Sequence, residues 1–172
     1  RGNMYLVENL SQAENIEINQ PENLCLVTQT TLSVSDTEEI VLKLKERFPL
    51  ILEPKSEDIC YATQNRQDAV KQLALETDLI IVVGSENSSN SNRLRELAEN
   101  CGVESFLIDD PEKISSLNLD NVNIMGITAG ASAPEELVQQ MVQKCNLLGY
   151  KVNEEISGLK EEVYFKLPAE LR

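Results

Sequence analysis

Short apolar runs alternate along this chain with longer segments whose apolar residues have helical spacing, and this alternation constrains the fold more than any other feature. The apolar runs predict strands at residues 4–7, 24–27, 79–83, 105–108, 122–127 and 162–167. Helices are predicted at residues 36–48, 65–76, 91–101 and 134–148. Strands that alternate with helices form mostly parallel sheets flanked by helices, so the predicted fold class is α/β.

Two of the predicted helices are preceded by the pattern of a capping box, a Ser that stands three residues before a Glu. Ser35 and Glu38 form this pattern at the first helix, and Ser132 and Glu135 form it at the last. Gly149 follows the last helix, where a glycine often ends the final turn. Both serines are therefore predicted to cap their helices.

Polar residues cluster after four points in the chain: TQTTLS after Val27, CYATQNRQ after Ile59, GSENSSNSNR after Val83 and TAGASAPEE after Ile127. The carboxyl ends of parallel strands form one edge of a sheet, where ligands bind and helix N-termini attract phosphate. Ordinary caps and turns would explain any one of these junctions. One cap suffices for a helix, however, whereas Ser and Asn fill the whole of residues 88–92. The residues alone therefore favour a hydroxyl-rich anion site, and no Walker-type or GxGxxG phosphate loop accompanies it.

The charge of the chain limits its partners. Its 172 residues include 29 acidic and 15 basic ones, which gives a net charge of −14. Such a surface repels nucleic acid and anionic membranes, so an anionic ligand needs a place on the protein where the local potential is less negative than the average. Residues 87–95 contain no acid and include Arg93 and Arg95. No apolar run approaches the ~20 residues of a membrane span, and we expect a cytoplasmic protein.

The cysteines do not resemble a zinc site, because the chain has four cysteines, no CxxC pair and no histidine. Cys25, Cys101 and Cys145 each stand within an apolar pattern, so we expect them to pack as small core residues. Cys60 is different, because it lies between acidic residues and a polar turn. From the residues alone, the prediction is an anion pocket beside one unusual cysteine.

Several of these segments together resemble a known family. TQTTLSV, DICYATQNRQ, VVGSENSSNSNRL, FLIDD and GITAGASAPEELV follow one another in the order and spacing of the C-terminal half of the LytB-type 4-hydroxy-3-methylbut-2-enyl diphosphate reductases. The resemblance runs from Met4 to the closing LPAELR, and the motifs have their bacterial form.

The resemblance implies a trilobal α/β protein that holds a 4Fe-4S cluster on three cysteines. It implies a reductive dehydroxylation in the methylerythritol phosphate route to isoprenoids: two electrons and two protons remove the hydroxyl of 4-hydroxy-3-methylbut-2-enyl diphosphate as water and leave isopentenyl and dimethylallyl diphosphate. Ferredoxin or flavodoxin is the implied electron donor. On this reading, residues 1–56 belong to the second lobe, residues 57–149 form the third lobe, and residues 150–172 form a tail that returns to a neighbouring lobe.

The resemblance also assigns site residues by position. Cys60 corresponds to the third cluster thiolate, and Thr30 to a threonine near the substrate hydroxyl, which implies a proton relay. The implied diphosphate ligands are Ser88, Ser89, Asn90 and Ser132. Gln29 and Asn87 are assigned more loosely, as partners of those ligands.

The chain departs from the family in what it lacks. The family has two further cluster cysteines, two substrate-contacting histidines and a proton-donating glutamate in its N-terminal half, and this sequence contains no histidine. We therefore expect a fragment that is inactive alone. Two alternatives stay open: a stand-alone diphosphate-binding or regulatory module without redox chemistry, and a fragment that another chain holds in its fold.

Overall fold

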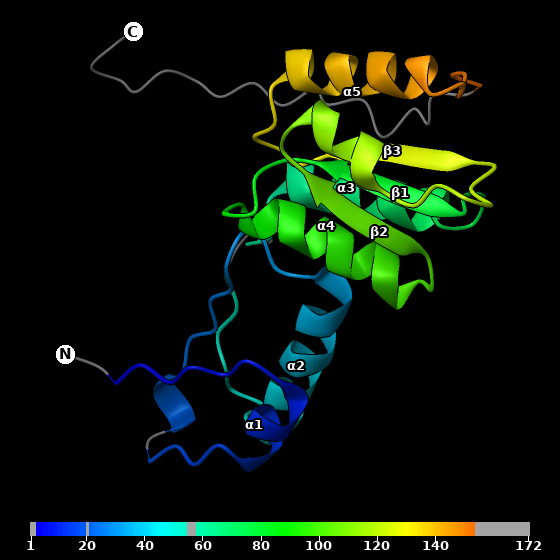
Figure 1. Ribbon diagram of the computed structural model, residues 1–172. Coiled ribbons are helices and arrows are strands. Elements are labelled where there is room, and N and C mark those ends of the chain that lie inside the picture. The colour runs from blue at the N-terminus through cyan, green and yellow to red at the C-terminus, as the bar shows by residue number, and fades with distance from the viewer. Residues whose placement is uncertain (1–2, 20, 55–57, 154–172) are drawn as a thin grey trace, which may run out of the picture.

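The computed structural model describes residues 3–19, 21–54 and 58–153. A three-stranded sheet forms the centre of its larger part, and helices lie on both faces (Figure 1). The elements, in chain order, are α1 (Leu10–Asn15), η1 (Pro21–Asn23), α2 (Val34–Arg47), α3 (Tyr61–Leu73), β1 (Leu79–Val83), α4 (Ser89–Asn100), β2 (Glu104–Ile108), η2 (Pro111–Ser116), β3 (Met125–Ala129) and α5 (Glu135–Leu147).

The sheet has the order β2-β1-β3, and both pairings are parallel. Every residue of β1 is buried, as expected for a central parallel strand that is covered on both faces. Side chains of a strand point to alternate faces. Accordingly, Leu79, Ile81 and Val83 pack in the core with Met141 of α5. On the opposite face, Ile80 and Val82 pack against α3 and α4 through Val70, Leu94 and Ala98. The predicted α/β fold class is thus confirmed.

The N-terminal part differs from the prediction, since no strand forms at residues 4–7. Met4 is 97% and Leu6 75% exposed. The predicted strand at 24–27 is reduced to one parallel bridge between Cys25 and Leu52. A strand needs a neighbour whose N–H and C=O groups pair with its own, and the described residues offer these segments a neighbour only at Leu52. The predicted strand at 162–167 lies outside the described residues.

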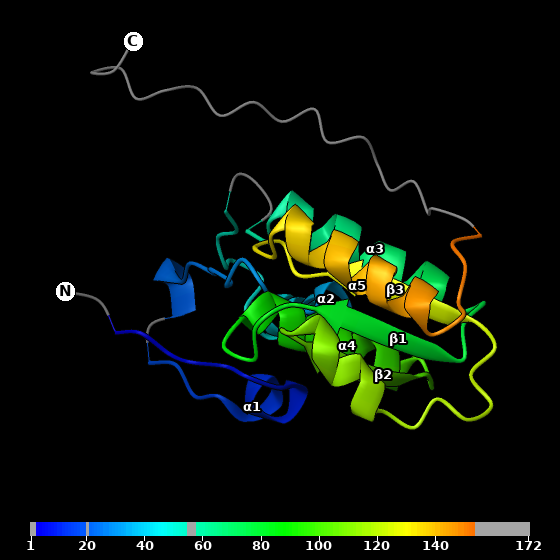
Figure 2. The same ribbon diagram turned by 45° about the horizontal axis from the view of Figure 1, so that its top comes forward.

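The short helix α1, which the pattern did not predict, contacts α2 and stands away from the sheet in both views (Figure 1, Figure 2). Arg47, at the end of α2, donates to the carbonyl oxygens of Ala13 and Ile16, the latter at 2.7 Å. The same guanidinium lies 5.0 Å from the centre of the Phe48 ring. Arg47 therefore ties the end of α2 to α1.

Both predicted capping boxes are wrong. The N-cap of α2 is Ser33, whose hydroxyl accepts a hydrogen bond from the N–H of Asp36 at 3.3 Å. At α5 the N-cap is Pro134, which has no side-chain acceptor. The pattern misplaced each cap by two residues because the cap is set by where the chain turns into the helix. Gly149 does follow α5, with φ of 101°, as predicted.

Strand β3 begins later than the predicted residue 122, because a turn comes first. Asn121 adopts a φ of 68°, and the Asp78 carboxylate accepts the N–H groups of Asn123 and Ile124 at 2.8 and 3.0 Å. These two main-chain N–H groups hold the pKa of Asp78 below its ordinary value, because they stabilise the charged form. None of the helices in the described part of the chain is long and apolar enough to cross a membrane.

Of the three cysteines predicted to pack in the core, only Cys145 does so. It is 5% exposed and its Sγ lies 3.7 Å from the Sδ of Met125. Burial raises the pKa of this thiol. Cys101 is exposed because it is the C-cap of α4, one step beyond the apolar stripe of that helix. Cys25 is exposed because its segment pairs at a single bridge instead of in a sheet.

Candidate functional site

The polar residues 88–92 lie at the start of α4, where this helix meets the ends of two strands. Gly84 follows β1 and Gly130 follows β3, and the N–H of Gly130 donates to the carbonyl of Val83 at 2.9 Å. The Ser91 Oγ occupies the space beside both glycines: a Cβ would lie 2.3 Å from this atom at Gly84 and 2.1 Å from it at Gly130. Only glycine fits at such distances, so the two glycines allow α4 to begin directly against the strand ends.

Three of the candidate residues occupy this helix start in different ways. Ser88 is the N-cap, and its hydroxyl accepts the N–H of Ser91 at 3.3 Å. Ser89, the first residue of α4, is exposed, whereas Asn90 is only 6% exposed. The first turn contains no acidic residue. The free N–H groups of a helix start carry partial positive charge and attract anions.

Buried polar atoms without a partner concentrate at this place. Within the described residues they are the Asn90 Nδ2 and Oδ1, the Ser91 Oγ and the Arg66 Nε. Arg66 reaches the site from α3, and its Nη1 donates to the carbonyl of Ala129, the residue before Gly130, at 3.2 Å. Most buried polar groups in proteins have a hydrogen-bond partner, so this local cluster of exceptions makes the start of α4 the strongest candidate for a ligand site among the described residues.

Thr30 and Cys60 are joined through the main chain. The Cys60 N–H donates to the Thr30 carbonyl at 3.0 Å. Cys60 is also the N-cap of α3, but its partly exposed thiol makes no capping hydrogen bond. Thr30 itself is exposed. The structure therefore places the candidate proton relay and the candidate cluster ligand next to each other at the start of one helix.

Two side chains fix the loop that carries Thr30 against α3. The Gln67 side chain accepts the N–H of Val34 at 3.1 Å and donates to the carbonyl of Leu32 at 2.8 Å. The Asp58 carboxylate accepts the N–H of Thr28 at 2.7 Å. Gln67 is buried, so its bonds are shielded from water.

The other candidates are less closely gathered. Ser132 is exposed between β3 and α5 and does not cap α5. Asn87 is exposed, and its N–H donates to the Ser85 hydroxyl at 3.2 Å. Gln29 lines a cavity of about 730 Å³, mostly formed by the N-terminal part and reached by Arg93 of α4.

Arg93 and Arg95 do not supply free positive charge to the site. Arg93 pairs with Glu96 at 2.8 Å and Arg95 with Glu99 at 2.6 Å. The arginine beside the site is instead Arg66, which the sequence analysis did not single out. The only available signal was its place in CYATQNRQ, one helix turn and a half after Cys60.

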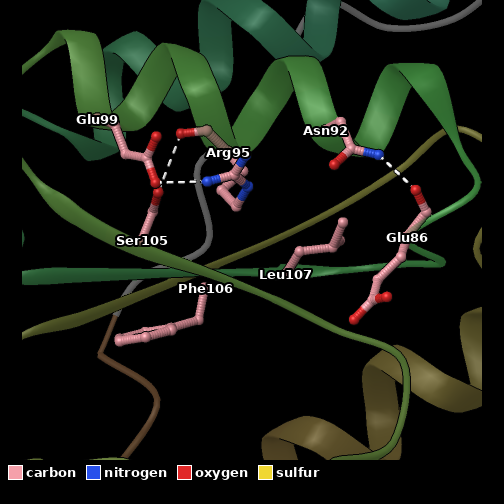
Figure 3. Close-up of a pocket in the computed structure, with 7 residues that line it drawn as sticks. All are labelled: Glu86, Asn92, Arg95, Glu99, Ser105, Phe106 and Leu107. Atoms are coloured by element: carbon pink, nitrogen blue, oxygen red, sulfur yellow. Dashed lines mark hydrogen bonds and ion pairs between the residues drawn. The ribbon is translucent and has the colours of Figure 1, made fainter.

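A shallow pocket of about 460 Å³ between α4 and β2 is a weaker candidate (Figure 3). Its polar groups already satisfy one another: Arg95 pairs with Glu99, the Ser105 hydroxyl donates to the Arg95 carbonyl at 2.9 Å, and Asn92 donates to the Glu86 carbonyl at 2.7 Å. Nothing in this pocket requires a ligand.

The described residues do not fit a complete iron–sulfur cluster. They contain no group of three or more His, Cys, Asp or Glu side chains that could hold a metal ion together. A four-iron cluster is normally held by several thiolates, and at this site Cys60 could provide one. Cys60 therefore fits as at most one ligand of such a cluster, and these residues bring no complete ligand set together.

The chain is similar to known proteins over most of its length. A family model described as "LytB protein" matches residues 1–146. The 4-hydroxy-3-methylbut-2-enyl diphosphate reductase of Shewanella oneidensis is 54% identical over 171 residues, which are 99% of this chain and 54% of that protein. The reductase of the same name from Chromohalobacter salexigens is 54% identical over 171 residues, with the same coverage.

The solved structure of the E-1-hydroxy-2-methyl-but-2-enyl-4-diphosphate reductase from Plasmodium falciparum is also similar. It is 39% identical to this chain with a TM-score of 0.74, and the match covers 85% of this chain and 45% of that one. The chain spans about half the length of the curated relatives it matches. The chain belongs to the LytB family.

Proposed function

We propose that this chain is the diphosphate-binding, C-terminal part of a 4-hydroxy-3-methylbut-2-enyl diphosphate reductase. In the reaction of the whole protein, the bond between carbon and the hydroxyl oxygen of the substrate breaks. Two electrons and two protons enter, the oxygen leaves as water, and isopentenyl or dimethylallyl diphosphate forms. A ferredoxin or flavodoxin supplies the electrons.

The observation that carries the proposal is the group of buried polar atoms without partners at the start of α4. A diphosphate presents several oxygens, each of which accepts more than one hydrogen bond. Asn90 Nδ2, the hydroxyls of Ser88, Ser89 and Ser132, and the free N–H groups of α4 then act as its donors. These donors are neutral, and hydrogen bonds to a charged acceptor are the stronger kind.

Thr30 and Cys60 have the remaining roles. The Thr30 hydroxyl passes a proton towards the leaving oxygen. Cys60 would give one thiolate to a 4Fe-4S cluster, which would supply the electrons for the reduction and which other parts of the whole protein would hold as well. By itself the chain then binds diphosphate without turnover. Support for a joint role comes from the hydrogen bond that joins Cys60 to Thr30.

A stand-alone diphosphate-binding module is the second candidate. It is favoured by the contrast between the two halves of the site, since the proposed diphosphate ligands all lie in this chain and only one of the proposed cluster ligands does. Both candidates predict the same anion pocket. They differ in whether Cys60 and Thr30 take part in a reduction.

Titration of the chain with pyrophosphate in a calorimeter tests the shared pocket. Ser132→Ala should weaken binding about tenfold, the value of one hydrogen bond to a charged group. Ser35→Ala is a matched control, because both serines are exposed near a helix start and neither is its N-cap. Equal affinity of both variants, or no binding by the unmodified chain, would contradict the proposal.

A further inference from the structure

Arg66 connects α3 to the end of β3. Its Nη1 donates to the carbonyl of Ala129, which is the last residue of the strand. Its Nε is buried and has no partner in the described part of the chain. The guanidinium therefore stands beside the segment that leads through Gly130 to Ser132, with hydrogen-bonding capacity left over.

The charge of Arg66 is also uncompensated within the described part of the chain. Seven cations of the described chain lie within ion-pair distance of a carboxylate: Lys43, Lys45, Lys71, Arg93, Arg95, Lys113 and Lys144. Among the same residues Arg66 has no such partner. Arg47 and the exposed Lys151 have no such partner either, but the Arg47 guanidinium binds two carbonyl oxygens, whereas the Arg66 Nε has no partner among the described residues. A bound anion would supply the missing counter-charge.

The end of β3 is held from two sides. Ala129 receives the bond from Arg66 of α3, and Gly130 lies against the Ser91 hydroxyl of α4. The loop then closes with the Ala133 N–H on the Gly130 carbonyl at 2.9 Å. Ser132 sits inside this short closed loop, so its place relative to α4 depends on where Ala129 and Gly130 are held.

We propose that Arg66 is a positioning residue of the diphosphate site: its guanidinium fixes Ala129 so that the following loop presents Ser132 towards the start of α4, and its charge raises the affinity for the anion. The proposal rests on the proposed function for the identity of the ligand. It does not require contact between Arg66 and the diphosphate, because the effect passes through the Ala129 carbonyl and through space.

Two measurements on the whole chain test this role. Hydrogen exchange without ligand reports the loop through the N–H groups of Gly130 and Ala133, which are both hydrogen-bonded. Calorimetry with pyrophosphate reports the anion site. Arg66→Met should speed exchange at both amides and weaken pyrophosphate binding about tenfold or more. Arg66→Lys, which keeps the charge, should recover most of the affinity. Arg95→Met is the matched control, because it removes a charge from α4 that is paired with Glu99, and it should change neither reading.

The outcomes distinguish the positioning role of Arg66 from the proposed diphosphate-binding function. Unchanged exchange at Gly130 and Ala133 in Arg66→Met overturns the positioning role. So does weakened pyrophosphate binding with unchanged exchange, since Arg66 would then act on the ligand directly. If Arg66→Met does not fold, Arg66→Lys decides alone: faster exchange with partly lost affinity supports the role, whereas unchanged exchange, or faster exchange with fully retained affinity, overturns it. If the unmodified chain binds no pyrophosphate, the proposed function fails, while faster exchange in Arg66→Met would still support the hold on Ala129.

Discussion

Replacement of Asn90 by Ala tests whether Asn90 binds the ligand or only stabilises the fold. Its side chain is 6% exposed, and neither of its amide atoms has a hydrogen-bond partner in the described chain. It does not cap α4, because that role belongs to Ser88. Asn90→Ala therefore removes no hydrogen bond that the described structure contains.

The expected effect on stability is small. A buried polar group without a partner costs about 1–3 kcal/mol, and the substitution removes that cost. The space left by the shorter side chain costs a comparable amount in lost packing. The two terms oppose each other, so the free energy of unfolding should change by at most about 1 kcal/mol, which corresponds to roughly 2–4 °C in the melting temperature of a chain of this size.

The expected effect on binding is large. A hydrogen bond to a charged group contributes roughly 1.5–3 kcal/mol, so the loss of the Asn90 Nδ2 donor should raise the dissociation constant for pyrophosphate about ten- to a hundredfold. Asn100→Ala, at the exposed end of the same helix, is the matched control and should leave both quantities unchanged. Calorimetric titration beside a melting curve measures them. A variant that keeps its affinity and loses several degrees would refute the reasoning, because Asn90 would then be a packing residue.

Three further predictions concern the surroundings of the site. Gly130→Ala should lower the melting temperature because its Cβ would lie 2.1 Å from the Ser91 Oγ, and the additional change Ser91→Ala should restore it, since the Ser91 Cβ is 3.3 Å away. In the full-length protein, Thr30→Val should lower kcat more than it changes KM, as steady-state kinetics would show, while the bond of Cys60 to the Thr30 main chain persists. Because the pKa of Asp78 is lowered in the folded state, its contribution to stability is complete above the ordinary aspartate pKa and is lost as the pH falls through the lower pKa of the folded state. Asp78→Asn should therefore reduce the fall of the melting temperature at acid pH. Asp120→Asn, at an exposed position, is the control and should not change that fall.

The sequence predicted best those elements whose own residues reveal how they are buried. Residues 79–83 were predicted without error as a strand, because a central parallel strand is buried on both faces and is apolar at every position. Residues 4–7 have a similar composition and form no strand, since strand formation depends on a neighbour that local sequence cannot reveal. The predicted helix caps were misplaced because a Ser three residues before a Glu is only a local pattern. The residue that caps a helix is determined by where the chain turns into that helix.

The candidate site shows the same limit. The density of Ser and Asn in residues 88–92 was visible in the sequence, and so was the odd setting of Cys60. Arg93 and Arg95 were the visible cations, yet both are paired with glutamates on their own helix. The contribution of Arg66 could not be read from the sequence, because the carbonyl it binds lies 63 residues further along the chain.

Helix α3 relates the two parts of the candidate site to each other. Its N-cap is Cys60, whose N–H donates to the Thr30 carbonyl, and two consecutive residues near the middle of the helix bind different segments of the chain. Gln67 binds the main chain of Leu32 and Val34, and Arg66 binds the carbonyl of Ala129. The loop that carries Thr30 and the strand end that precedes Ser132 are therefore both fastened to one rigid element. Because a helix moves as a unit, a shift of α3 would displace the proposed proton relay and the proposed diphosphate ligand together and would change the distance between these two residues little.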